Sequence, residues 1–358
     1  MLAKRPRLCS APPLAVRWLS STASTPPYRV LFFGADQFSC DVFQQLHAAR
    51  KDLVEKCTVV TPPDQRVGRR GKDLHRPRLR LLAEELGVQT MALPEKSLLT
   101  GWEPPDAFLR SKRSPQNLLL TASFGHLIPT SLLAAHFEPL NALNVHPSLL
   151  PRWRGAAPIQ WSILAGDWEG GVTVQELSRG RFDRGRILAQ EQTRLAPDAD
   201  FPTLERTLAQ QGGRLLVSTL RHLAERQRLA VPQSNTGATH ARKLTREDAR
   251  VEWETKTAEE VCRMQRAIGH QHPLWTTFAD DLVVQLDVES VPLLSSESSA
   301  PSAPAPAPGS LAFDPASRRL SIACRSGSVV VKRVKRQGGK GWIEAREWWA
   351  GNKSRFLK

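Results

Sequence analysis

Residues 28–49 read YRVLFFGADQFSCDVFQQLHAA, and this stretch decides the class of fold. Its first six residues are almost all apolar, as in a buried strand, and the chain turns at Gly34. Beyond the turn, apolar residues recur at helical spacing. A strand followed at once by a helix is the opening βα unit of an α/β domain. The stretch lacks a GxGxxG motif, so it carries no signal for dinucleotide binding.

Further strand and helix patterns alternate after this unit. CTVVTPP at 57–63, NLLLTASFG at 117–125 and ALNVH at 142–146 predict strands. PRLRLLAEELG at 77–87 and PTSLLAAHF at 129–137 predict helices. Alternating units of this kind predict a parallel sheet covered by helices on both faces.

The pattern changes in the last third of the chain. Residues 226–246 are polar and rich in turn-forming residues, and we read them as a linker between domains at 28–225 and 247–358. The second domain shows one helical pattern and several short strands without helices between them, which predicts a small β-barrel (OB-like) or a sandwich. Within it, residues 293–310 are too polar and proline-rich to pack, so we expect a mobile loop.

The composition is that of a soluble globular protein with an excess of positive charge. Of the 358 residues, 41% are hydrophobic and 24% are charged, and no run of about 18 apolar residues could span a membrane. The five cysteines are scattered without a CxxC pair, so neither a disulfide framework nor a cysteine zinc site is indicated. The net charge of +15 predicts a polyanionic partner, and the plain alternative is a charge that keeps the protein soluble.

The first 25 residues have the composition of a mitochondrial transit peptide. They contain four basic residues, no acidic residue, and serines and threonines near their end. Prolines and Arg17 interrupt the apolar stretch that a secretory signal would need. We therefore expect residues 1–25 to direct the protein to the mitochondrial matrix, and the alternative is a disordered basic tail.

The strand pattern at 142–146 carries the candidate chemistry. Alternate side chains of a strand share a face, so Asn144 and His146 project together, and Pro147 then ends the strand. Ligands bind at the carboxyl ends of strands in an open parallel sheet. A neutral amide can donate to an oxygen that becomes negative, and a histidine can transfer a proton near neutral pH. The pair suits attack on a carbonyl, although both residues could merely satisfy backbone groups at a strand end.

The longer string NVHPSLLPRWRGAAPIQ at 144–160, followed by ILAGDWEGGVTV at 163–174 and GRFDRG at 180–185, resembles the folate-dependent formyltransferases. The resemblance is strongest to the branch that formylates methionyl-tRNA, in its mitochondrial form. It implies a Rossmann-like formyltransferase domain followed by a tRNA-binding barrel. It also implies that Asn144, His146 and Asp183 are the catalytic residues; without it, Asp183 would be read as an ordinary turn residue.

The implied reaction moves a formyl group from 10-formyltetrahydrofolate to the α-amino group of methionine esterified to tRNA. Asn144 would donate to the formyl oxygen, His146 would stabilise that oxygen or relay a proton, and Asp183 would orient His146 and accept the proton of the amine. By the same resemblance, part of the folate pocket would be formed by Ser148, Leu149, Leu150 and Pro151, and its other wall by residues 121–129.

No metal is expected. His126 beside Gly125 is read as a loop residue, and His270 with His272 has no acidic or cysteine companion nearby.

Two basic regions are the candidate tRNA contacts. Residues 61–80 hold seven basic and two acidic residues, and residues 309–358 hold twelve basic and three acidic ones. A charge run is often only a solvated face, but tRNA enzymes of this family carry a basic, glycine-containing loop in the first region. The candidates there are Arg66, Arg69, Arg70 and Lys72, with Arg69 or Arg70 as reader of the acceptor end. In the second region the candidates are Lys332, Arg333, Lys335 and Arg336, which would contact phosphates.

The sequence thus predicts a mitochondrial enzyme, expected as a monomer, with methionyl-tRNA and folate as partners and no membrane association. Three rival hypotheses stay open. Another folate-dependent formyltransferase, acting on a purine precursor or a sugar, would share the catalytic residues. A formyltetrahydrofolate hydrolase would use water as the acceptor. A non-catalytic mitochondrial RNA-binding protein would use only the basic surfaces.

Overall fold

The computed structural model describes residues 27–67, 72–94, 99, 101–110, 114–178, 180–278, 281–289 and 306–356. The expected transit peptide, the candidate readers Arg69 and Arg70, and most of the expected loop at 293–310 lie outside the described residues. Among the described residues, no helix combines the length and apolar character needed to cross a membrane.

The N-terminal part alternates strands and helices, as the sequence predicts. Its elements are β1 (Tyr28–Phe33), α1 (Gln37–Ala48), α2 (Arg50–Leu53), β2 (Val54–Thr61), β3 (Gln65–Val67), β4 (Asp73–His75), α3 (Arg78–Glu85), β5 (Gln89–Ala92), α4 (Asp106–Arg110), β6 (Asn117–Ala122), α5 (Thr130–His136), β7 (Ala142–His146), β8 (Arg154–Gly155), α6 (Pro158–Ala165), β9 (Glu169–Glu176), β10 (Ile187–Arg194), α7 (Phe201–Arg221) and α8 (Leu223–Arg228).

Seven of these strands form one sheet in the order β10-β9-β7-β6-β1-β2-β5. The five strands from β7 to β5 are parallel, which confirms the expected parallel sheet. Strands β9 and β10 add two antiparallel strands that the sequence analysis did not predict. Both were missed because β9 carries a glycine pair, Gly170–Gly171, near its start and β10 is polar along its exposed half, so neither reads as a continuous buried run.

Helices cover both faces of this sheet, and successive side chains of β1 point to opposite faces. Val30 and Phe32 pack with residues of α1, α3 and α7, whereas Leu31 and Phe33 pack with residues of α4 and α5. Gly34 makes the turn into α1, where an added Cβ would lie 2.9 Å from the carbonyl oxygen of Ala122. The turn therefore needs glycine for close approach.

The C-terminal part is mostly antiparallel. Its elements are β11 (His240–Ala241), the 3-10 helix η2 (Arg246–Ala249), α9 (Ala258–Ile268), β12 (Leu274–Phe278), β13 (Leu282–Val288), β14 (Leu311–Asp314), β15 (Arg319–Ala323), β16 (Ser328–Arg336), β17 (Ile343–Glu344) and α10 (Ala345–Phe356). Strands pair in the order β12-β13-β16-β15-β14, with β17 beside β16. The fold class, an α/β domain followed by a small β domain, agrees with the sequence prediction. Within the described residues, no pairing joins the edge strands β12 and β14 into a closed barrel.

The segment at 226–246, read as a linker, lies against the first sheet domain. Residues up to Arg228 continue α8, and Val231 forms an isolated bridge with Ile187. Further along, β11 pairs in parallel with β8. The segment therefore contacts the loop that follows β7, and this loop is part of the candidate site.

Candidate active site

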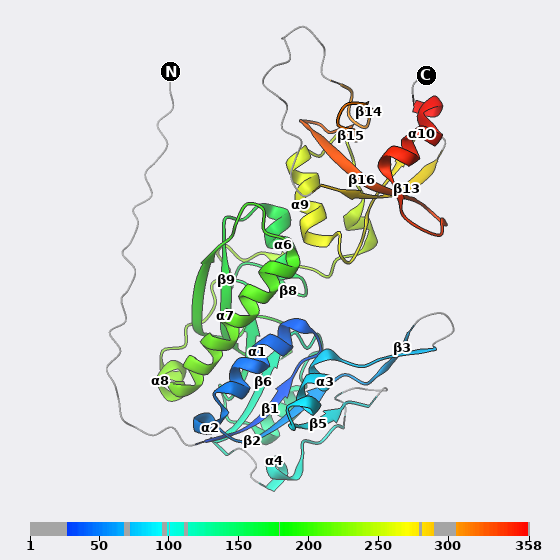
Figure 1. Cartoon of the computed structure of the whole chain (residues 1–358). Helices are drawn as coiled ribbons and strands as arrows, with labels where there is room; N and C mark the ends of the chain where they lie inside the picture. The colour runs from blue at the N-terminus through cyan, green and yellow to red at the C-terminus, as the bar shows by residue number, and fades with distance from the viewer. Residues whose placement is uncertain are drawn as a thin grey trace, which may run out of the picture.

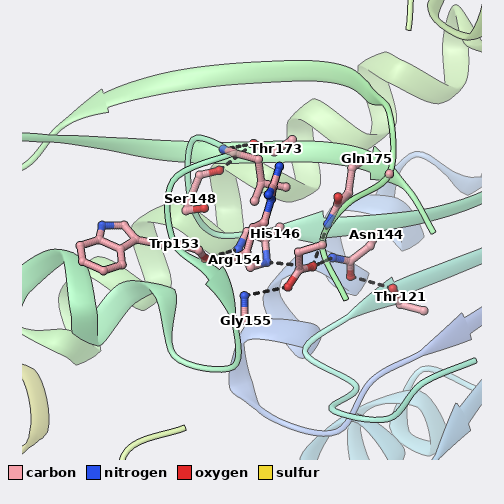
Figure 2. Close-up of polar contacts among 12 residues, drawn as sticks. Thr121, Asn144, His146, Ser148, Trp153, Arg154, Gly155, Thr173 and Gln175 are labelled. Carbon is pink, nitrogen blue, oxygen red and sulfur yellow. Dashed lines mark hydrogen bonds and ion pairs between the residues drawn. The ribbon is translucent and has the colours of Figure 1, made fainter. Parts of the chain in front are cut away.

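Strand β7 presents an amide and an imidazole on one side of the sheet. Asn144 and His146 alternate with Val145, which is buried in the core cluster that includes α7 residues. The hydroxyl of Thr121 on β6 donates a 2.7 Å hydrogen bond to Oδ1 of Asn144. Because Oδ1 accepts this bond, Nδ2 of Asn144 is left to donate on the other side, as Figure 2 shows.

The carboxylate of Asp183 lies at the centre of the site. It accepts hydrogen bonds from Nε2 of Gln175 at 2.8 Å and from the backbone amide of Gly155 at 2.9 Å. Its Oδ1 also lies 3.5 Å from Nδ2 of Asn144 and 3.5 Å from Nδ1 of His146. The structure therefore brings together the three residues that the resemblance named.

His146 is held between two acceptors. Its side chain is only 5% exposed, and Nε2 lies 2.9 Å from the carbonyl oxygen of Trp153. A carbonyl only accepts, so Nε2 carries a proton and donates it. The other ring nitrogen faces Asp183. The imidazole is thus oriented by a carboxylate on one side and presents an N–H on the other.

An amide, an imidazole and a carboxylate within reach of one another can support acyl transfer. Amide and imidazole N–H groups stabilise an oxygen that gains negative charge, and the carboxylate can take up a proton. This chemistry needs neither a metal nor a covalent intermediate on the protein. Among the described residues, no group of three or more His, Cys, Asp and Glu side chains could hold a metal ion. His270 instead stacks on Phe201, with ring centroids 4.4 Å apart.

Sequence reasoning missed the residues that support Asp183. Gln175 alternates with Val174 on β9, so strand periodicity could have revealed it. Gly155 has a φ of +123°, and an added Cβ would lie 2.5 Å from the carbonyl oxygen of Ala241. Asp183 itself has a φ of +53° in the loop between β9 and β10, a conformation without a periodic signal.

Arg154 is a further unpredicted residue of the site. It is 6% exposed, and its guanidinium donates to Oε1 of Gln233 at 2.9 Å and to the carbonyl oxygen of Ser234 at 3.1 Å. Burial lowers the pKa of Arg154, and the charge of Arg184 adds to this effect. A buried guanidinium with fixed acceptors is a rigid part of the site.

The predicted folate segment Ser148–Pro151 uses its backbone groups internally. Thr173 donates to the carbonyl oxygen of Ser148 at 2.6 Å and accepts from the amide of Leu150 at 3.2 Å. Gln190 donates to the carbonyl oxygen of Leu150 at 2.8 Å. The outer side of the segment borders a cavity of about 320 Å³, which is lined in part by Ser148, Leu149, Trp153, Trp168, Leu195 and Leu208.

Two loops beside Asn144 carry exposed apolar side chains. The loop after β6 exposes 42% of Leu127, and the loop after β9 exposes 55% of Phe182. Both loops border one apolar cluster, to which the first contributes Phe124 and the second contributes Leu177. His126 packs its ring edge-on against Phe124, which is an ordinary loop contact.

The predicted tRNA contacts differ in their surroundings. Arg66 and Lys72 are exposed on and beside the β3–β4 hairpin, which projects from the body of the protein in Figure 1. Lys332 and Arg333 both pair with Asp287, and the Lys332 distance is 3.0 Å. Lys335 and Arg336 form no ion pair with any described residue.

Two family models match the chain. Residues 28–220 match the model described as formyl transferase, and residues 243–353 match the formyl transferase C-terminal domain. The mitochondrial methionyl-tRNA formyltransferase of Bos taurus is 34% identical over 86% of this chain and 74% of its own length. The methionyl-tRNA formyltransferase of Gluconacetobacter diazotrophicus is also 34% identical, over 88% of this chain and 94% of its own length.

Two solved structures share the fold. The N-formyltransferase of Helicobacter canadensis, solved with folinic acid and dTDP-3-aminofucose, superposes with a TM-score of 0.55 at 13% identity, over 85% of this chain and 98% of that one. HypX of Aquifex aeolicus, solved with tetrahydrofolic acid, gives 0.51 at 20% identity over 92% of this chain. The chain spans about half the length of HypX, with 47% covered.

Proposed function

The chain belongs to the formyl transferase family, and from this premise we propose that it transfers the formyl group of 10-formyltetrahydrofolate to the α-amino group of methionyl-tRNA. The observation that carries the proposal is the cluster of Asn144, His146 and Asp183. Nδ2 of Asn144 and Nδ1 of His146 each lie 3.5 Å from Oδ1 of Asp183. The names of the relatives support methionyl-tRNA as the acceptor.

In the proposed reaction, the methionyl amine attacks the formyl carbon and the bond from that carbon to folate N10 breaks. The formyl oxygen is negative between these events, and Nδ2 of Asn144 donates to it. A donor of this kind lowers the barrier by about 3 kcal/mol. His146 either releases the Trp153 carbonyl and donates its N–H to the formyl oxygen, or passes a proton to N10. Asp183 orients His146 and accepts, through water, the proton that the amine loses.

We propose that the folate ring binds between the loop at 123–127 and residues 180–183. The exposed side chains of Leu127 and Phe182 support this position, since they offer apolar surface on the loops that follow β6 and β9. The segment Ser148–Pro151 remains part of the proposed pocket as the wall behind His146. Its bonded backbone groups give it shape and rigidity.

We further propose that tRNA lies across the β3–β4 hairpin and the C-terminal sheet. Arg66 and Lys72 of the hairpin are exposed, as are Lys332, Arg333 and Arg336 on β16. Arg69 or Arg70 remains the proposed reader of the acceptor end. Phosphate contacts from such residues position the nucleic acid without reading its sequence.

The proposed setting is the mitochondrial matrix, with the enzyme as a monomer. The basic, acid-free composition of residues 1–25 supports import, as do relatives named as mitochondrial. A fluorescent protein fused behind residues 1–25 should enter mitochondria, and a cytosolic distribution of that fusion would contradict the proposal. Sedimentation of the purified protein should give a single species near 39.8 kDa or slightly below it after cleavage.

A transfer assay tests the reaction against its rivals. Purified protein is mixed with 10-formyltetrahydrofolate labelled in its formyl group and with methionyl-tRNA, uncharged tRNA, free methionine or a nucleotide-linked amino sugar. We expect label only on methionyl-tRNA. Formate release without tRNA would indicate a hydrolase, labelled sugar would indicate a sugar formyltransferase, and tRNA binding without transfer would indicate a non-catalytic RNA-binding protein.

A further inference from the structure

Gln233 is turned toward the site from a segment that is otherwise on the surface. Its neighbours Pro232 and Ser234 are exposed, whereas Gln233 is half-buried. The chain is fixed just before it by the two backbone hydrogen bonds between Val231 and Ile187, at 2.8 and 3.0 Å. The Gln233 side chain therefore reaches the site from an anchored backbone.

The amide nitrogen of Gln233 faces three oxygen acceptors, two in the loop that carries Asp183 and one on Gln175 of β9. Nε2 lies 2.8 Å from the carbonyl oxygen of Gly185, 3.1 Å from that of Asp183, and 3.0 Å from Oε1 of Gln175. Gln175 in turn donates to Oδ1 of Asp183 at 2.8 Å. Gln233 thus contacts both the backbone of Asp183 and the residue that holds its carboxylate.

Arg154 fixes the orientation of this amide. A guanidinium only donates, so the group that Arg154 contacts at 2.9 Å must be Oε1 of Gln233. The NH2 group of Gln233 is then directed at the Asp183 loop. The second bond of Arg154, to the carbonyl oxygen of Ser234, holds the backbone on the other side. With both ends of the amide assigned, the side chain has one bonded orientation.

We infer that Gln233 is a positioning residue that holds Asp183 in register with His146 and Asn144. The effect on catalysis rests on the proposed function. The effect on the position of Asp183 does not, because it is measured on the protein without substrates. Loss of the Gln233 amide removes the contacts to the loop at 183–185. The carboxylate of Asp183 then shifts away from the 3.5 Å approach to His146. Groups that orient a catalytic side chain in this way contribute roughly 10- to 100-fold to rate.

The test compares two glutamines of the same region. Gln233→Met keeps the length of the side chain and removes both its donor and its acceptor. Gln227→Met does the same to a glutamine of α8, which donates to Asn141 at 2.8 Å and to the carbonyl oxygen of Leu140 at the far end of β7. Gln233→Glu retains an acceptor for Arg154 but sets a carboxylate against three acceptors. Backbone hydrogen exchange is measured on the free protein, and kcat and KM are measured with both substrates.

We expect the amide of Gly155 and the loop at 180–187 to exchange at least about tenfold faster in Gln233→Met and Gln233→Glu, with exchange in β1 unchanged. The kcat of both variants should fall about 10- to 100-fold with each KM changed less than about threefold. Gln227→Met should keep kcat within about twofold of the parent even where its thermal stability falls equally.

Two results would overturn the inference. Unchanged exchange at Gly155 in Gln233→Met would show that the glutamine does not hold the loop. Faster exchange with parental kcat would show that the loop position does not matter for catalysis. If the parent protein transfers no formyl group to methionyl-tRNA, the proposed function fails, and the exchange comparison still decides whether Gln233 holds Asp183.

Discussion

The backbone amide of Gly155 donates a 2.9 Å hydrogen bond to Oδ2 of Asp183, joining two segments 28 residues apart in the chain. This bond ties the loop that carries Asp183 to β8, which also pairs with β11. Three segments therefore meet at one glycine: the loop after β7, the loop after β9 and the segment before the C-terminal sheet. The position of the Asp183 carboxylate depends on all three.

Gly155→Ala should lower kcat at least about tenfold, because the new Cβ would lie 2.5 Å from the carbonyl oxygen of Ala241 and would separate β8 from β11. The matched control is Gly237→Ala, which has a φ of +74° but no atom within 4 Å of the added Cβ. The control also places an alanine at a positive φ, without the clash. Equal kcat values for the two variants would show that the close approach at Gly155 is unimportant.

Asn144→Ala and His146→Ala should each lower kcat at least about 100-fold, because each removes a donor to the developing negative charge. Folate affinity should change far less, since neither side chain supplies the proposed apolar walls of the pocket. Steady-state kinetics and folate binding by fluorescence measure the two effects. Turnover near that of the parent in either variant would place the reaction elsewhere.

Lys335→Ala with Arg336→Ala should weaken tRNA binding more than Lys332→Ala with Arg333→Ala. Asp287 already neutralises much of the charge of Lys332 and Arg333, whereas Lys335 and Arg336 have no acidic partner among the described residues. Each lost phosphate contact removes about 0.9 from the slope of log affinity against log salt concentration. Binding measured across a salt series checks this. A larger slope change for the Lys332 and Arg333 variant would show that these two residues make the main phosphate contacts.

Glu205→Gln should make the protein more stable at pH 8 and leave its stability unchanged near pH 4. Burial, and then the charges of Asp36 and Asp41, raise the pKa of Glu205 from 4.5 to about 7. A raised carboxyl pKa contributes stability below the unfolded value, and that stability is lost as pH rises through about 7. The difference in free energy of unfolding should reach on the order of 1 kcal/mol after solvent screening.

Denaturant unfolding at several pH values measures this difference for Glu205→Gln. The control is Glu225→Gln on the exposed side of α8, which should follow the parent at every pH. A constant difference between Glu205→Gln and the parent from pH 4 to pH 8 would contradict the raised pKa.

Part of this site could be predicted because strand periodicity carries it. Asn144 and His146 occupy alternate positions of a strand that Pro147 ends, and the parallel sheet places that end at a ligand-binding edge. Asp183 needed the family resemblance, because a loop residue with positive φ leaves no periodic pattern. Strands β9 and β10 were missed for a different reason: they are antiparallel strands of mixed polarity at one edge of the sheet, so neither reads as a continuous apolar run.

The supporting residues depend on contacts across long sequence distances. Gln233 meets Gln175 across 58 residues, and Trp153 meets Thr239 across 86. A polar, turn-rich segment such as 226–246 reads as a linker because nothing in its own pattern indicates the surface it covers. Its role at the site follows only from the folded arrangement, in which β11 pairs with β8.

The most direct test of the central claim is a single-turnover transfer from formyl-labelled 10-formyltetrahydrofolate to methionyl-tRNA, run in parallel with the parent protein and Asp183→Asn. With the parent we expect labelled formylmethionine, which mild base releases from the tRNA. With Asp183→Asn we expect a rate lower by at least about 100-fold. Equal rates for the two proteins, or label on free methionine with none on methionyl-tRNA, would contradict the central claim.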